Sequence, residues 1–212
     1  MILINHSLSV KSLFHCLNLL LFTLFLQKEN TFMRKTITIF GSSVPKYGDE
    51  QYAVAEKLGE LLALKGFNVC SGGNLGIMEA VSKGAVNHGA TAIGITLGYA
   101  GFTPNKFLTE EISCSSLFER ITKLIEYGDG YVILQGGTGT LLELSAVWEL
   151  MNKNMLKAKP IVCHSNMWRE IVKIMNEQLR KENRLTDLVK CFNSVEDIVE
   201  YLVKTLSNHA NQ

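Results

Sequence analysis

A glycine-rich run that ends in a carboxylate is the part of this sequence best suited to chemistry. Residues 135–143 read Gln-Gly-Gly-Thr-Gly-Thr-Leu-Leu-Glu, after the apolar stretch 131–134 and before a long apolar-periodic segment. This order predicts a strand, a glycine turn and a helix. Such a turn directs several backbone N–H groups at one point, at the positive end of the helix dipole, where phosphate binds. Glu143 lies within one helical turn of that point, so the pattern favours an enzyme acting on a phosphorylated small molecule.

Glu143 and Arg120 each admit a structural and a functional interpretation. Thr140 and Glu143 have the spacing of a capping box, in which two side chains satisfy the backbone N–H groups that begin a helix. Alternatively, Glu143 lies at the mouth of the phosphate site, where a negative charge opposes anion binding unless the chemistry uses it. Arg120 falls in a helix expected over residues 117–127. There it is either a solvated cation paired with Glu119 or the cation that matches Glu143 at the same sheet edge.

Strand and helix signals alternate from Met33 onward, and these elements must position the candidate residues. Strands are expected over residues 36–40, 67–70, 91–97, 107–112, 131–134, 160–163 and 189–192. Helices are expected over residues 50–65, 75–87, 117–127, 140–152, 167–181 and 195–206. The alternation predicts βαβ crossovers and a mostly parallel sheet. We therefore expect a single Rossmann-like, doubly wound α/β domain over residues 33–208.

Three glycine-bearing turns follow strands of this sheet. They are Gly41-Ser42-Ser43, the segment 71–76 (Ser-Gly-Gly-Asn-Leu-Gly) and the run 135–140. Each turn alone could be structural, because tight turns favour glycine. Three turns at the carboxyl edge of one sheet, where such folds bind ligands, favour a binding site. No P-loop motif occurs, and the first strand lacks G-x-G-x-x-G, so dinucleotide binding fits poorly.

The totals exclude several classes of function. The chain has 212 residues and a formal net charge of +1, so no general field attracts nucleic acid or anionic lipid. The five cysteines are scattered and form no C-x-x-C pair, which indicates reduced, cytoplasmic usage. The histidines show no metal-ligand spacing, so no metal is expected.

Residues 1–32 do not match the rest of the chain. Their apolar stretch over 13–26 is shorter than the roughly 20 residues that span a bilayer, and no small-x-small cleavage site follows it. We expect an extension outside the fold, with Met33 as the true start, rather than a membrane anchor. Membrane contact is expected only if this extension is retained.

Two of the glycine segments resemble the signatures of the Lonely-guy (LOG) family, once labelled lysine decarboxylases. The run 135–143 resembles P-G-G-x-G-T-x-x-E, and Gly72-Gly73-Asn74-Leu75-Gly76-Ile77-Met78 resembles the other signature. The resemblance covers residues 35–206. It implies a Rossmann-like, usually dimeric phosphoribohydrolase, which cleaves a nucleoside 5′-monophosphate such as AMP or a cytokinin riboside monophosphate. The products are the free base and ribose 5-phosphate, and the chemistry needs no cofactor.

The resemblance also implies roles for particular residues. The catalytic pair of the family corresponds to Arg120 and Glu143. Glu143 would stabilise oxocarbenium character on the sugar and orient water, while Arg120 would bind phosphate or ribose oxygens or steady the glutamate. The binding set implied by the motifs, with the turn after the first strand, is Gly136, Gly137, Thr138, Gly139, Thr140, Gly41, Ser42, Ser43, Gly72, Gly73, Asn74, Gly76 and Met78. Base contacts are expected from loops such as residues 98–106.

Three positions depart from the family pattern. Gln135 replaces the motif proline, Ile121 stands where cytokinin-activating members typically have lysine, and Leu142 stands where many have a second glutamate. They indicate a divergent, bacterial-type branch, and they keep open a non-catalytic nucleotide-binding or sensing protein of the same fold. A pyridoxal-dependent decarboxylase would need a Schiff-base lysine. The candidates for it (Lys83, Lys106 and Lys123) occur in no supporting pattern.

Overall fold

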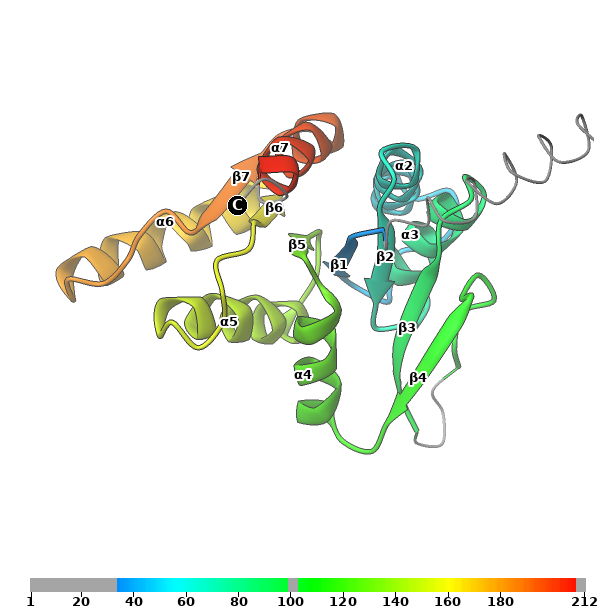
Figure 1. Ribbon diagram of the computed structural model, residues 1–212, viewed down its shortest axis with the longest axis horizontal. Coiled ribbons are helices and arrows are strands. Elements are labelled where there is room, and N and C mark those ends of the chain that lie inside the picture. The colour runs from blue at the N-terminus through cyan, green and yellow to red at the C-terminus, as the bar shows by residue number, and fades with distance from the viewer. Residues whose placement is uncertain (1–33, 99–102, 209–212) are drawn as a thin grey trace, which may run out of the picture. The chain divides into compact units, whose positions relative to one another are not determined.

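The chain folds as an alternation of strands and helices in a computed structural model that describes residues 34–98 and 103–208 (Figure 1). The strands are β1 (Thr36–Phe40), β2 (Asn68–Ser71), β3 (Ala92–Leu97), β4 (Glu110–Cys114), β5 (Gly130–Ile133), β6 (Ile161–His164) and β7 (Val189–Phe192). The helices are α2 (Glu50–Leu64), α3 (Ile77–Val86), α4 (Leu117–Tyr127), α5 (Thr138–Asn152), α6 (Asn166–Lys181) and α7 (Val195–Asn208). The expectations for residues 1–32 lie outside the described residues.

The strands form one seven-stranded sheet in the order β4-β3-β2-β1-β5-β6-β7. Every neighbouring pair is parallel. The chain runs outward from β1 through β2 to β4, and then returns to the other side of β1 with β5. Loops that leave β1 and β5 in opposite directions open a crevice at their carboxyl ends. The predicted doubly wound α/β fold is confirmed.

Helices cover both faces of the sheet, which explains the nearly continuous apolar strands. Helices α2, α3 and α7 pack against Ile37, Ile39 and Val132, and α4, α5 and α6 pack against Phe40 and Ile133. Neighbouring residues of β1 and β5 thus serve opposite layers, as the two-residue period of a strand requires. Figure 1 shows α2 and α7 on one side of the strands and α4 and α5 on the other.

Two glycines let α2 and α3 approach closely. A Cβ atom on Gly59 would lie 2.2 Å from the carbonyl oxygen of Val81, and one on Gly84 would lie 2.0 Å from that of Glu56. Each glycine faces the backbone of the other helix. The close packing holds α3 against the sheet, and with it the loop that precedes α3.

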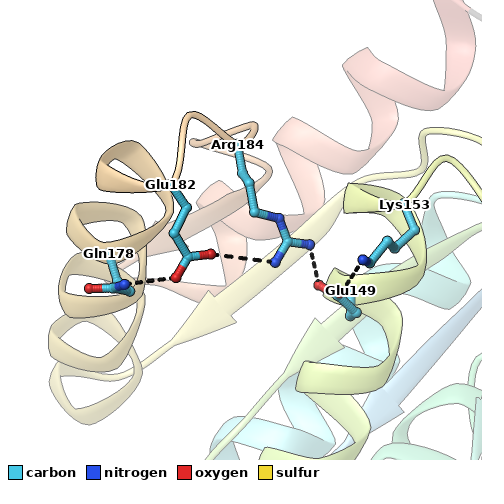
Figure 2. A network of polar contacts seen from close by, with 5 residues as sticks. All are labelled: Glu149, Lys153, Gln178, Glu182 and Arg184. Atoms are coloured by element: carbon cyan, nitrogen blue, oxygen red, sulfur yellow. Dashed lines mark hydrogen bonds and ion pairs between the residues drawn. The ribbon is translucent and has the colours of Figure 1, made fainter.

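A polar network joins α5 to the end of α6 (Figure 2). Arg184 donates from Nη2 to Oε2 of Glu149 at 2.6 Å, and Lys153 lies 3.7 Å from the same carboxylate. Gln178 donates to Glu182 at 2.7 Å. Exposed pairs of this kind stabilise a fold by about 0–1 kcal/mol each, so apolar contacts mainly set the position of α5.

Helices α5 and α6 also line an apolar cavity of about 400 Å³, to which Glu149 and Arg184 of this network contribute. Its lining comprises Leu141, Leu144, Ser145, Trp148, Glu149, Asn152, Ile171, Met175, Leu179 and Arg184. Among the helices in the described ranges, none combines the length and apolar character that crossing a bilayer requires.

Candidate active site

A cavity of about 330 Å³ opens at the carboxyl ends of β1 and β5. It is lined by Gly41, Ser42, Ser43, Asn74, Met78, Leu97, Arg120, Gly137, Thr138, Gly139, Thr140 and Glu143. Loops after three strands, the start of α5 and one side chain of α4 therefore meet at one place. Most residues of the predicted binding set lie here, together with Leu97, which sequence reasoning missed.

The start of α5 is an open helix N-terminus. Its N-cap is Gly137, which supplies no capping side chain, and no acidic residue lies in the first turn. The first intrahelical bond runs from the N–H of Leu141 to the carbonyl of Gly137, at 3.0 Å. The N–H groups of Thr138, Gly139 and Thr140 therefore have no acceptor within the helix. They are available to an anion at the positive end of the helix dipole.

Open space surrounds the glycines of this turn. A Cβ atom added to Gly137 or to Gly139 would meet no atom within 4 Å. Glycine is therefore not needed here to relieve contact with the rest of the protein. By contrast, a Cβ on Gly136 would lie 2.1 Å from the hydroxyl of Thr140. The emptiness beside Gly137 and Gly139 suits the close approach of a ligand.

The capping-box interpretation of Thr140 and Glu143 is wrong. Helix α5 begins at Thr138, two residues before the predicted start, so Thr140 already lies inside the helix. Glu143 consequently lies most of a turn beyond the position that a capping-box glutamate occupies, and its side chain cannot reach back to the N-cap N–H. Its side chain is instead buried, with an exposed fraction of 9%, and lines the cavity.

Arg120 forms an ion pair with Glu143 inside the cavity. The Nη1–Oε1 distance is 3.6 Å, and the exposed fraction of Arg120 is 9%. Nε of Arg120 also donates to the carbonyl of Ile95 at 2.7 Å. Glu119, the partner suggested by a solvated arginine, accepts instead from the N–H and the hydroxyl of Ser115. The interpretation of Arg120 as a surface cation is therefore wrong.

Gly72 makes room for the guanidinium group. A Cβ atom at this position would lie 1.5 Å from Nη2 of Arg120 and 2.9 Å from the sulfur of Met78. Any larger residue at 72 would displace the arginine. Gly72 thus supports Arg120 rather than lining the cavity.

Burial dominates the electrostatics of Glu143. Loss of solvent raises the pKa of the Glu143 carboxyl from an ordinary 4.5 to about 7, and the nearby charge of Arg120 opposes the rise. A carboxyl that titrates near neutral pH can exchange a proton with a substrate or with water under physiological conditions. The pair therefore combines a fixed cation with an acid–base group.

The remaining predicted residues hold the loops together. Gly76 has φ +70°, and a Cβ there would lie 2.5 Å from the carbonyl oxygen of Ser42, so only glycine lets the two loops touch. Gly73 is buried against β3, where a Cβ atom would lie 2.8 Å from Cγ2 of Thr96. Gly136 lines a neighbouring cavity of about 340 Å³ together with Ser42 and Gln135.

Asn105 is a further residue that sequence reasoning missed. It is buried, and its amide donates to the carbonyl oxygens of Gly73 and Asn74, at 3.1 Å each. It thereby fixes the loop that carries Asn74. No sequence signal distinguished it from other loop asparagines. Of the 98–106 loop expected to contact the base, residues 99–102 lie outside the described residues.

Lysine is missing from the cavity lining formed by the described residues. Lys83 pairs with Glu56 at 2.8 Å, and Lys106 and Lys123 do not line this cavity either. In the described part of the chain, no three His, Cys, Asp or Glu side chains cluster as metal ligands would.

Curated relatives match parts of the chain. A protein of Archaeoglobus fulgidus named "Uncharacterized protein" is 30% identical over 119 residues, which is 56% of this chain and 78% of that protein. The pyrimidine/purine nucleotide 5′-monophosphate nucleosidase of Escherichia coli K12 is 32% identical over 45% of this chain, but only 23% of the enzyme. The cytokinin riboside 5′-monophosphate phosphoribohydrolase of Rhodococcoides fascians is 27% identical over 53% of this chain and 59% of the enzyme. The matches thus span less than two thirds of either enzyme.

Solved structures share the fold. The molybdenum cofactor carrier protein of Chlamydomonas reinhardtii superimposes with a TM-score of 0.66 at 21% identity, covering 82% of this chain and 99% of that one. The molybdenum cofactor binding protein of Rippkaea orientalis gives a TM-score of 0.66 at 22% identity, covering 83% and 99%. A protein-family model described as the SLOG cluster4 family matches residues 34–197. Because that match spans most of the chain, the protein belongs to the SLOG cluster4 family, in agreement with the LOG resemblance of its two glycine motifs.

Proposed function

We propose that this protein hydrolyses the N-glycosidic bond of a nucleoside 5′-monophosphate and releases the free base and ribose 5-phosphate. One observation carries the proposal: the buried pair of Arg120 and Glu143 faces the same cavity as the open N-terminus of α5. The names of the E. coli and R. fascians relatives support this reaction class.

Phosphate binding would orient the substrate. The N–H groups of Thr138, Gly139 and Thr140 would hold the phosphoryl oxygens at the positive end of α5. The hydroxyls of Ser42 and Ser43, which line the same cavity, would bind further oxygens of the phosphate or ribose. A ribose held by its phosphate presents C1′ in one orientation, and such positioning lowers the barrier of the following step.

Glu143 would act at the sugar. As the C1′–N bond breaks, positive charge develops on the ribose ring, and an ionised carboxylate beside it stabilises that charge. The same carboxylate would accept a proton from the attacking water, whose oxygen becomes bonded to C1′. The base leaves with the bonding electron pair and takes up a proton. Arg120 would bind a ribose or phosphate oxygen and keep the Glu143 carboxylate in place.

Incubation with a panel of nucleoside 5′-monophosphates tests this function. Chromatography should detect free base and an equal amount of ribose 5-phosphate. Glu143→Gln should slow the release of both by about 10²- to 10⁴-fold while nucleotide still binds. Glu149→Gln is the matched control, because Glu149 lies on the same helix but is exposed. Base release at the wild-type rate in Glu143→Gln, or an equal loss of rate in Glu149→Gln, would contradict the proposed role.

A non-catalytic nucleotide-binding protein is the second candidate. It is favoured by Ile121, which stands where cytokinin-activating relatives typically have lysine. The Ile121 side chain is 5% exposed and packs in the apolar cluster of α4. It does not line the cavity, so this position supplies no cation to the site. Calorimetric binding of AMP without any base release over hours would favour this candidate.

We also propose that the protein is a cytoplasmic homodimer, with membrane contact only through residues 1–32 if they are retained, and without a nucleic-acid partner. Apolar side chains exposed on α5 and α6 support self-association: Leu141, Leu142, Met167, Ile174 and Met175. Light scattering after size exclusion should give twice the chain mass. A Met175→Glu variant should shift the protein toward the monomer, and a wild-type monomer would refute the dimer.

A further inference from the structure

Two cysteines meet on adjacent strands at the edge of the sheet away from the active site. Cys163 on β6 and Cys191 on β7 are register partners, so their side chains point to the same face of the sheet, where both pack in the same apolar cluster. Neighbouring strands lie about 4.8 Å apart, which falls inside the roughly 4.4–6.8 Å range of Cα separations that disulfides span. The pair therefore meets the first geometric requirement for a reversible cross-strand disulfide.

The two thiols differ in access and in acidity. Cys163 is fully buried, whereas Cys191 is half-buried and lines a surface groove of about 340 Å³. The neighbouring Cys163 thiol and the charge of Arg169 lower the pKa of Cys191, while the neighbouring Cys191 thiol and burial raise the pKa of Cys163. Cys191 is therefore the thiol suited to attack an external disulfide. Cys163 is the thiol suited to resolve the mixed disulfide that forms on Cys191.

The groove around Cys191 is cationic. Its lining includes Arg169, Lys173, Arg180 and Lys190, against one carboxylate, Glu177. Within the described part of the chain, Nε of Arg169 is buried without a hydrogen-bond partner. Such a groove attracts an anionic reactant and lowers the cost of a thiolate at its floor.

The other two described cysteines provide an internal contrast. Cys70 and Cys114 are buried in the core, and burial raises the pKa of both, that of Cys70 to about 12. Neither lines the cationic groove. Among the described cysteines, only Cys191 combines partial exposure with a neighbouring cysteine, a groove and several cations.

We propose that Cys163 and Cys191 form a redox-active pair that reacts with a small anionic disulfide bound in this groove. The Cys191 thiolate attacks one sulfur of that disulfide, and the other sulfur leaves as a thiolate. Cys163 then gives up its proton to the released thiolate and attacks the Cys191 sulfur, which expels the second thiolate. This second thiolate takes up from water a proton that replaces the one Cys191 gave up on ionisation. In sum, two protein thiols are oxidised to one disulfide, and the small disulfide is reduced to two thiols.

Oxidation of the full-length protein with glutathione disulfide tests the pair, with peptide mapping by mass spectrometry after the remaining thiols are blocked. The wild type should yield a Cys163–Cys191 disulfide. A Cys163→Ser variant should stop at glutathione linked to Cys191, and Cys191→Ser should show neither product. Mapping also separates these products from any reaction at Cys16, which lies outside the described residues.

The role of the groove is tested by comparison with the uncharged bis(2-hydroxyethyl) disulfide. For each disulfide, the rate of reaction with Cys191 is divided by its rate with a free thiol in solution. This ratio should be about tenfold larger for glutathione disulfide than for the uncharged disulfide, and high salt should remove the difference. If Cys163→Ser unfolds, wild type and Cys191→Ser still decide the question. Equal modification of Cys70 or Cys114, a mixed disulfide in the wild type that never resolves, or an unreactive Cys191 would overturn the proposal.

Discussion

Replacing Glu143 with glutamine should change how the stability of the protein depends on pH. Burial raises the pKa of Glu143 from 4.5 to about 7, so the folded protein binds this proton more tightly than the unfolded chain does. At about 1.4 kcal/mol per unit of pKa, ionising Glu143 in the folded state costs roughly 3 kcal/mol. This contribution to stability is intact below pH 4.5, and it is lost as the pH rises toward 7.

Glutamine has no proton to lose, so the variant should escape this loss. The free energy of unfolding of Glu143→Gln, relative to wild type, should therefore rise by about 3 kcal/mol between pH 4.5 and pH 7 and then level off. The pH-independent cost of changing the contact with Arg120 cancels, because only the change with pH is compared. Urea unfolding followed by circular dichroism at a series of pH values measures it.

The same variant links stability to activity. If the carboxylate acts on the sugar, kcat should fall by about 10²- to 10⁴-fold while KM changes little. Glu149→Gln, on the exposed side of α5, should leave kcat unchanged. A difference between Glu143→Gln and wild type that stays constant from pH 4.5 to pH 7 would refute the assignment of a buried, proton-binding Glu143.

Three further outcomes are expected. In the wild type, kcat/KM should rise with pH and level off above about 7, because the ionised carboxylate is the active form, and a flat pH–rate profile would oppose this. Gly72→Ala should lower kcat at least as much as Arg120→Ala, since its Cβ would lie 1.5 Å from Nη2 of Arg120; unchanged kinetics would show that the guanidinium can move freely. Gly139→Ala should stabilise α5 by up to about 1 kcal/mol in thermal unfolding, because its Cβ meets no protein atom. The same change should raise the KM for the nucleotide if the phosphate occupies that space, and an unchanged KM would place the phosphate elsewhere.

Local patterns predicted most elements closely, and the errors have physical causes. The predicted bounds of β1, α4 and β7 agree with the structure, because each has a clear apolar pattern between distinct breaks. Strand β4 was expected over 107–112 and lies at Glu110–Cys114. As an edge strand it is mostly exposed, so no continuous apolar run marks its position.

The start of α5 was misjudged for a different reason. Sequence rules look for a capping side chain, and Thr140 offered one. The helix instead begins after Gly137, where no side chain caps the backbone and the N–H groups remain open. Here the uncapped start faces the cavity, and rules based on a capping side chain do not predict it.

The sequence by itself determined the alternation of strands and helices, and hence a parallel sheet that gathers three glycine turns at one edge. It could not decide whether Arg120 faces solvent, because an arginine beside apolar residues on a helix fits either environment. Only the tertiary structure decided this. Gly72, just after β2, leaves space for the guanidinium, and Ile95 of β3 supplies the carbonyl that accepts from it. The raised pKa of Glu143 has the same origin, because burial is a property of the packed fold.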